Sequence, residues 1–249
     1  MRFSMVWTTL LRRCTRHASP LLRGLACIVV PLPLAAQSVS PPIAEYQERA
    51  RSSYQLINST LFPLSVVLEV RGFQVTEAGE VQDAPLDTTK VRVKLSAMSF
   101  RIPPRATYTV FYEAAADSAP AWFNIVSALT GAKTDNGLNV RILLPHVVYL
   151  NQKEALRRDE VVVRAFELDT AAKKARVQLE NLGPRLGRVQ QVTASTDKTT
   201  SPPSAGFPLF PHMLRWTEID WNQAVAPDRL SVRFARFSID TALAPVPTP

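Results

Sequence analysis

The chain is poor in the residues on which many enzymes and metal proteins depend. It has two cysteines, three histidines and only eight glycines in 249 residues. It contains no G-x-S-x-G, no Walker-type glycine loop and no G-x-G-x-x-G, so the usual signatures of serine hydrolases and of nucleotide-binding folds are missing. Glu218 and Asp220 share one face of an expected strand, where a solvated edge is a commoner role than an acid pair. We therefore expect no enzymatic activity, no metal and no cofactor.

The first 36 residues have the pattern of a secretory signal. Five arginines and no acidic residue lie within residues 1–23, and an uncharged apolar run follows from Gly24 to Ala36. A basic stretch, a short apolar run and a small-residue site are typical of a cleaved signal. The run is shorter than the roughly 20 residues of a membrane-spanning helix, and Pro31 and Pro33 interrupt it. We predict cleavage after Ala36, export to the periplasm and no stable membrane insertion afterwards.

Removing this segment changes what the composition implies. It holds five of the 29 basic residues and none of the 21 acidic ones, so the formal net charge falls from +8 to +3. A nucleic-acid partner therefore loses its main support. Cys14 and Cys27 also lie in this segment, so the exported chain has no disulfide and depends on packed cores.

From residue 53 onward the chain alternates short apolar runs with turns. Val91–Leu95 alternates apolar and charged residues, the period of a half-buried strand. We expect strands at 53–58, 64–70, 91–95, 107–112, 121–129 and 138–150, and then at 160–168, 175–180, 188–194, 212–219 and 230–239. Residues 42–51 fit either a first strand or a short helix, because Glu45 and Arg49 form a favourable i,i+4 pair.

Strands at this spacing, without a strong amphipathic helix between them, favour β-sandwiches. We predict an all-β chain of two immunoglobulin-like sandwich domains, the first over 37–154 and a smaller second over 159–240. Residues 241–249 are expected to be a disordered tail.

Several motifs in the first domain resemble the periplasmic chaperones of usher-pathway pilus assembly. They are Tyr54–Asn58 followed by Leu64–Val70, the turn Phe100-Arg101-Ile102-Pro103-Pro104 before the strand at Tyr108–Tyr112, and Val140–Leu150. The second domain resembles the shorter C-terminal domain of the family at Leu179–Asn181, Leu209–Pro211 and Arg215-Trp216. The resemblance implies a chaperone that binds pilus or fimbrial-type subunits, with an outer-membrane usher as a further partner.

The resemblance also implies that the last strand of the first domain completes the unfinished sheet of a subunit. Leu138, Val140, Ile142 and Leu144 alternate along this strand, so we expect them to project from one face toward the subunit, while Leu143, Val147 and Tyr149 face the home core. An ordinary buried strand would show the same alternation, and periodicity alone leaves the two alternatives open.

The family grips the terminal carboxylate of its subunit with an Arg early in the first domain and a Lys late in the donor strand. Here the candidates for this anchor are Arg49, Arg51, His146 and Lys153. His146 falls near the late position, where a neutral imidazole lacks the permanent charge of lysine. The sequence therefore departs from the family at this point. A plain immunoglobulin-like envelope or adhesion module without chaperone activity remains the alternative function.

Overall fold

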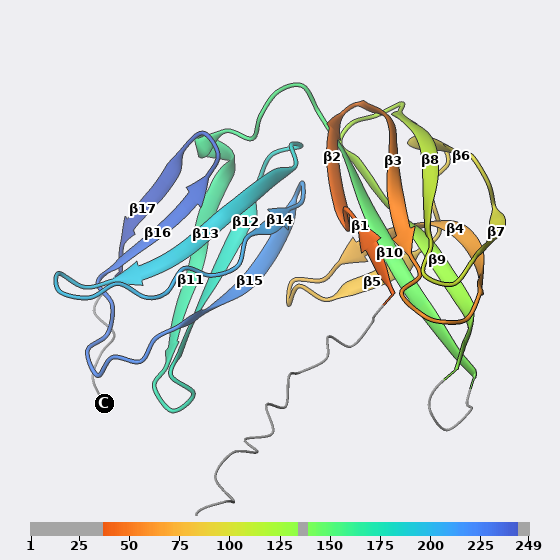
Figure 1. Cartoon of the computed structure of the whole chain (residues 1–249). Coiled ribbons are helices and arrows are strands. Elements are labelled where there is room, and N and C mark those ends of the chain that lie inside the picture. The colour runs from red at the N-terminus through yellow and green to blue at the C-terminus, as the bar shows by residue number, and fades with distance from the viewer. Residues whose placement is uncertain (1–36, 134–138, 244–249) are drawn as a thin grey trace, which may run out of the picture. The chain divides into compact units, whose positions relative to one another are not determined.

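The computed structural model describes residues 37–133 and 139–243. Within these ranges the regular structure is β-strand, apart from a short 3-10 helix at Arg158–Glu160. None of their helices is long and apolar enough to cross a membrane. The predicted signal at 1–36 lies outside the described residues. The prediction of two immunoglobulin-like sandwiches is confirmed (Figure 1).

The first sandwich is built from strands β1 to β10. These are β1 (Ser38–Ser40), β2 (Ile43–Gln47), β3 (Arg49–Ile57), β4 (Leu64–Val75), β5 (Val81–Ala84), β6 (Val91–Leu95), β7 (Ser99–Ile102), β8 (Thr107–Ala116), β9 (Ala121–Lys133) and β10 (Asn139–Asn151). One sheet has the order β1-β3-β8-β6, and the other has the order β2-β10-β9-β4-β5 with β7 also paired to β4. The segment at 42–51 is therefore strand, and the helical alternative is wrong.

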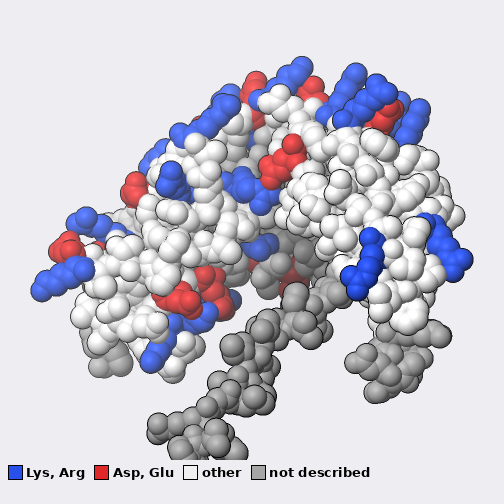
Figure 2. All heavy atoms as spheres, in the orientation of Figure 1, with Lys and Arg blue, Asp and Glu red and all other residues white. Residues whose placement is uncertain are grey.

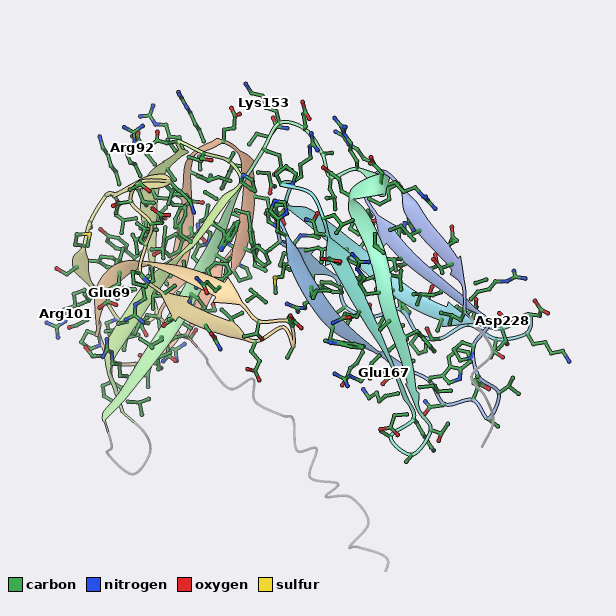
Figure 3. The ribbon with its side chains drawn as sticks, turned by 180° about the vertical axis from the view of Figure 1, so that it is seen from behind. Glu69, Arg92, Arg101, Lys153, Glu167 and Asp228 are labelled. Carbon is green, nitrogen blue, oxygen red and sulfur yellow. The ribbon has the colours of Figure 1, made fainter. Side chains whose placement is uncertain are left out.

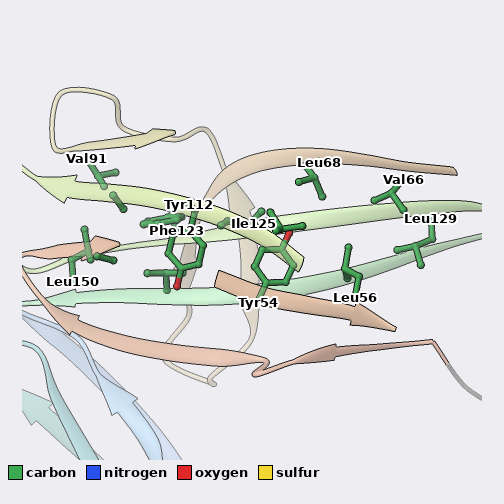
Figure 4. Close-up of a cluster of buried hydrophobic side chains, with 14 of the residues drawn as sticks. Tyr54, Leu56, Val66, Leu68, Val91, Tyr112, Phe123, Ile125, Leu129 and Leu150 are labelled. Carbon is green, nitrogen blue, oxygen red and sulfur yellow. The ribbon is translucent and has the colours of Figure 1, made fainter. Parts of the chain in front are cut away.

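The core of the first sandwich follows from the two-residue period of its strands. Tyr54 and Leu56 in β3 face Phe123 and Ile125 in β9, and all four are at most 1% exposed. Figure 4 shows these side chains filling the space between the two sheets. Side chains of opposite sheets interdigitate in this way in β-sandwiches.

The second sandwich is built from strands β11 to β17. These are β11 (Val161–Asp169), β12 (Lys174–Asn181), β13 (Gly187–Ser195), β14 (Phe207–Leu209), β15 (Met213–Asp220), β16 (Arg229–Phe234) and β17 (Ser238–Ala242). They form the sheets β11-β12-β15 and β14-β13-β16-β17. The expected single strand at 230–239 is two strands joined by a turn. Strand β17 continues to Ala242, so the expected tail does not begin at residue 241, and residues 244–249 lie outside the described part.

A buried asparagine closes the same turn in both sandwiches. Asn58, at the end of Tyr-Gln-Leu-Ile-Asn, donates through its amide to the carbonyls of Phe62 (2.8 Å) and Pro103 (2.9 Å), and its Oδ1 accepts from the Thr60 N–H at 3.0 Å. Asn181, at the end of Val-Gln-Leu-Glu-Asn, donates to the Arg185 carbonyl at 2.6 Å and accepts from Gly183 N–H at 3.0 Å. Both asparagines are fully buried.

Replacing Asn58 with alanine should destabilise the first sandwich by about 2–3 kcal/mol, because several buried backbone groups lose their hydrogen-bond partner at once. The measurement is the urea midpoint of the variant against the parent. Gln55→Ala, on the exposed face of the same strand, is the matched control and should stay within about 0.5 kcal/mol of the parent. Equal midpoints for the two variants would contradict the role given to Asn58.

Candidate functional site: the free edge of strand β10

Strand β10 has neighbours on both sides over only part of its length. It pairs antiparallel with β9 from Asn139 to Leu150, whereas β2 covers its other side only from Val147 to Asn151. Figure 1 shows β2 beside one end of the long strand β10. None of the described strands pairs with that side of β10 between residues 139 and 146. This stretch is an unpaired sheet edge inside a protein domain.

The backbone groups at this edge can be assigned from one hydrogen bond. The N–H of Val147 donates to the Pro42 carbonyl at 2.9 Å, so Val147 directs its backbone groups toward β2. Because backbone groups alternate sides along a strand, Leu143 and Pro145 direct theirs to the same side, where β2 is absent. No described strand therefore pairs with the N–H and C=O of Leu143 on this side, and Pro145 offers only a C=O there.

The side chains of β10 alternate between the core and the outer face. Ile142 and Leu144 are half-buried and pack against the core of the first sandwich. Leu143 points to the outer face and is 49% exposed. The expectation that Leu143 faces the home core is therefore wrong: period-two alternation fixes which residues share a face, but it does not say which face is inside.

The other residues of the two alternating sets predicted on this strand, one facing the subunit and one facing the home core, are placed as follows. Val140 is half-buried and lies outside the core cluster that includes Ile142 and Leu144, and Leu138 lies outside the described residues. Val147 and Tyr149 share the face of Leu143 and pack with Phe73 rather than with the main core. The structure thus leaves Ile142 and Leu144 next to the free edge, each with part of its surface still exposed.

His146 is buried at the end of the free edge. Its ring is 0% exposed and stacks on Tyr54 with 4.5 Å between the ring centroids. Its Nδ1 lies 2.7 Å from the Pro41 carbonyl and its Nε2 lies 3.1 Å from the Tyr112 hydroxyl. A carbonyl only accepts, so Nδ1 carries the hydrogen and donates it. Both ring nitrogens are thereby engaged inside the protein.

Burial dominates the electrostatics around this histidine. It lowers the pKa of His146 below the ordinary value of 6.5, and the hydrogen bond to the Pro41 carbonyl opposes that shift. Burial also raises the pKa of Tyr54 to about 12, against a smaller opposite effect of the Ser127 hydroxyl. At neutral pH this pocket is therefore uncharged.

The structure does not bring the four candidate anchor residues together. Arg49 and Arg51 lie on the exposed face of β3, in the opposite sheet, and Arg51 forms an ion pair with Glu113 at 3.1 Å. Lys153 follows β10, is 76% exposed and lies 3.5 Å from Glu48; Figure 3 shows it projecting away from the fold. His146 is buried between the sheets. A carboxylate cannot reach all four at once.

The Phe-Arg-Ile-Pro-Pro segment has a structural role in this protein. Phe100 and Arg101 belong to β7, and Phe100 stacks on Tyr108 with 3.8 Å between the centroids. Pro103 and Pro104 form the exposed turn that follows. The carbonyls of Ile102 and Pro103 accept from the buried Asn58 amide, so this turn is held by the asparagine described above.

The two acidic residues Glu218 and Asp220 form ion pairs on the surface. Glu218 and Asp220, in β15, both lie near Lys174, at 3.7 and 2.8 Å, so they are a solvated ion-pair group. Figure 2 shows basic and acidic side chains interspersed over the visible face. Among the described residues, no three histidines, cysteines or carboxylates lie close enough to hold a metal ion.

Sequence reasoning missed the prolines that bound the edge. Pro41 and Pro42 precede β2 and are exposed, and Pro145 lies within β10. A proline inside an apolar strand is confined to sheet edges because it lacks an N–H. Pro145 was therefore a signal in the sequence that this strand has an open side.

Comparison with known proteins finds no matching family model and no matching curated sequence. Solved structures do match. The complex of the SafA pilin with the SafB chaperone from Salmonella enterica matches with a TM-score of 0.50 and 11% identity, over 84% of this chain and 97% of that chain. The class 5 fimbriae chaperone CfaA matches with a TM-score of 0.49 and 8% identity, over 85% of this chain and all of that chain.

A further match is the CsuC–CsuE chaperone–tip subunit complex of Acinetobacter baumannii, with a TM-score of 0.47 and 10% identity, over 83% of this chain and 98% of that chain. The match to the SafA–SafB complex shows that this chain has the two-sandwich fold of a fimbrial chaperone. The fold expected from the sequence motifs is thus confirmed.

Proposed function

We propose that this protein is a chaperone that binds pilus or fimbrial-type subunits by donating strand β10 to their incomplete sheet. The observation that carries the proposal is the edge of β10 between Asn139 and His146, which no described strand covers. The side chains of Ile142 and Leu144, which are partly exposed, lie along it. An unpaired edge beside apolar side chains invites strand addition.

The mechanism follows from what an incomplete sandwich lacks. Its missing strand leaves backbone groups without partners and an apolar groove open to water, and both promote aggregation. Strand β10 supplies backbone groups at Leu143 and apolar side chains at Val140, Ile142 and Leu144. Burial of one such side chain contributes about 1.5–3 kcal/mol. No nucleotide, metal or other cofactor is needed.

We expect the protein to bind its subunit in the periplasm. The secretory pattern of residues 1–36 supports export to the periplasm, and the fold shared with SafB, which was solved with a pilin, supports a subunit as client. An outer-membrane usher is proposed as the partner that receives the loaded chaperone. The alternative, an envelope module with the same fold, would retain no subunit.

The test is co-expression with a pilin-type subunit that lacks its last strand, followed by size-exclusion chromatography. Val140→Asp should abolish the complex, because it places a carboxylate on the donor edge but outside the core cluster. Ile142→Asp is less suitable, since its side chain packs against the core. Val67→Asp is the matched control: Val67 is 51% exposed on β4, away from the β10 edge, and binding should persist. Retention of the subunit by Val140→Asp would refute the proposal.

A further inference from the structure

The free edge of β10 ends at a boundary formed by Pro41, Pro42, Pro145 and His146. Strand β2 begins at Ile43 and occupies the edge of β10 from Val147 onward. A second strand lying along Asn139–Pro145 would therefore run into Pro41 and Pro42. The available length is about 23 Å at ~3.3 Å per residue.

Two hydrogen bonds fasten this boundary to β10. Nδ1 of His146 donates to the Pro41 carbonyl at 2.7 Å, and the N–H of Val147 donates to the Pro42 carbonyl at 2.9 Å. His146 is itself fixed by its stack on Tyr54 inside the core. The segment before β2 is thus held from the inside of the sandwich. The boundary formed by Pro41, Pro42, Pro145 and His146 is therefore rigid and blocks further extension of a docked strand, and it is called the stop below.

The chemistry of the stop is neutral. Pro145 has no N–H to offer, the carbonyls of Pro41 and Pro42 already accept hydrogen bonds, and both ring nitrogens of His146 are engaged. Two of the candidate anchor cations are directed elsewhere: Arg51 is paired with Glu113 on the outer face of β3, and Lys153 lies beside Glu48. A carboxylate arriving at the stop would find none of its four residues charged.

We infer that the strand docked on β10 ends at this neutral stop and is recognised by its backbone and its alternating apolar side chains, without an ion pair to a terminal carboxylate. The inference rests on the proposed function and specifies its ligand. The partner segment is an extended, apolar stretch, and either the end of a chain or an internal segment satisfies the site equally well.

The experiment uses the exported chain and two ten-residue peptides of alternating Thr and Val, one with a free carboxyl terminus and one with a terminal amide. Dissociation constants and hydrogen exchange of the Leu143 amide are measured for both. We expect constants within about twofold of each other and protection of Leu143 by both peptides. Pro145→Ala, which supplies the missing N–H, should tighten both by about fivefold, the effect of one hydrogen bond.

A carboxylate peptide that binds tenfold more tightly than the amide would overturn the neutral stop while leaving strand donation intact. If neither peptide protects Leu143, strand donation fails and the stop fails with it. Pro42→Lys is the positive control, because it places a cation at the stop while its carbonyl remains available to Val147. This variant should acquire a preference for the carboxylate peptide, which shows that the assay detects one.

Discussion

Replacing Leu144 with proline should strongly destabilise the first sandwich, whereas the same change at Leu143 should leave its stability nearly unchanged and remove subunit binding. The two residues are adjacent, but their backbone groups point to opposite sides of β10. Leu144 lies opposite Ser127 of β9 and packs against the core, so proline there removes a ladder hydrogen bond and a buried side chain together. The loss should be about 3 kcal/mol or more, a large part of the 5–15 kcal/mol by which domains are usually stable.

Leu143 directs its N–H to the open side, and its side chain is 49% exposed. Proline at this position should change the stability by less than about 1 kcal/mol, as for other exposed edge positions. It should nevertheless abolish subunit capture, because the ring fills the space of the incoming strand and removes the donor. Urea midpoints and co-purification measure the two effects, and Leu143→Ala, which keeps the N–H, should still bind. If both proline variants fold equally well, β10 does not have the open edge assigned to it.

The sequence predicted the fold well where the two-residue alternation of apolar side chains and the turn-forming residues indicate the same strand. Val91–Leu95 is a strand with the predicted ends, and the run at 138–150 is the strand β10 at 139–151. The sequence missed short strands such as β5, which has few apolar residues, and β14, which spans only the three residues Phe-Pro-Leu. Their pairing with β4 and β13 makes them strands, and such long-range pairing leaves no local pattern.

The site was predicted less well than the fold. The periodicity of residues 138–144 identified the strand but not its inner face. Alternation shows which residues share a face, but it does not show which of the two faces is buried. Only the packing of Ile142 and Leu144 against the core, with Leu143 outside, settles the direction. The open edge itself depends on where β2 ends, which is a property of the tertiary structure.

The candidate anchor residues were chosen by their position along the sequence, and the structure places them on different parts of the first sandwich. Position along the strand placed His146 near a carboxylate anchor, but His146 lies on the same face of β10 as Ile142 and Leu144, which pack against the core. A histidine on the inner face of a strand must satisfy its nitrogens within the protein. The contacts with the Pro41 carbonyl and the Tyr112 hydroxyl do so, and they hold the imidazole inside the first sandwich.

The buried state of His146 predicts that the first sandwich loses stability as the pH falls below 6.5. Burial lowers the pKa of His146 in the folded protein, so the unfolded chain binds the proton first. Stability is therefore complete above the unfolded value of 6.5 and declines as the pH falls from there toward the folded pKa. The slope approaches about 1.4 kcal/mol per pH unit in that window. Urea midpoints between pH 7.5 and 5 measure it.

A neutral side chain at position 146 separates this effect from general acid sensitivity. His146→Gln should be less stable than the parent at pH 7.5, since it loses the stack on Tyr54, but its stability should depend far less on pH between 7.5 and 5. Tyr112→Phe removes one hydrogen-bond partner of the imidazole and keeps the histidine, so the pH dependence should persist there. If His146→Gln declined as steeply as the parent, another group would be responsible, and His146 would not be the proton acceptor on unfolding.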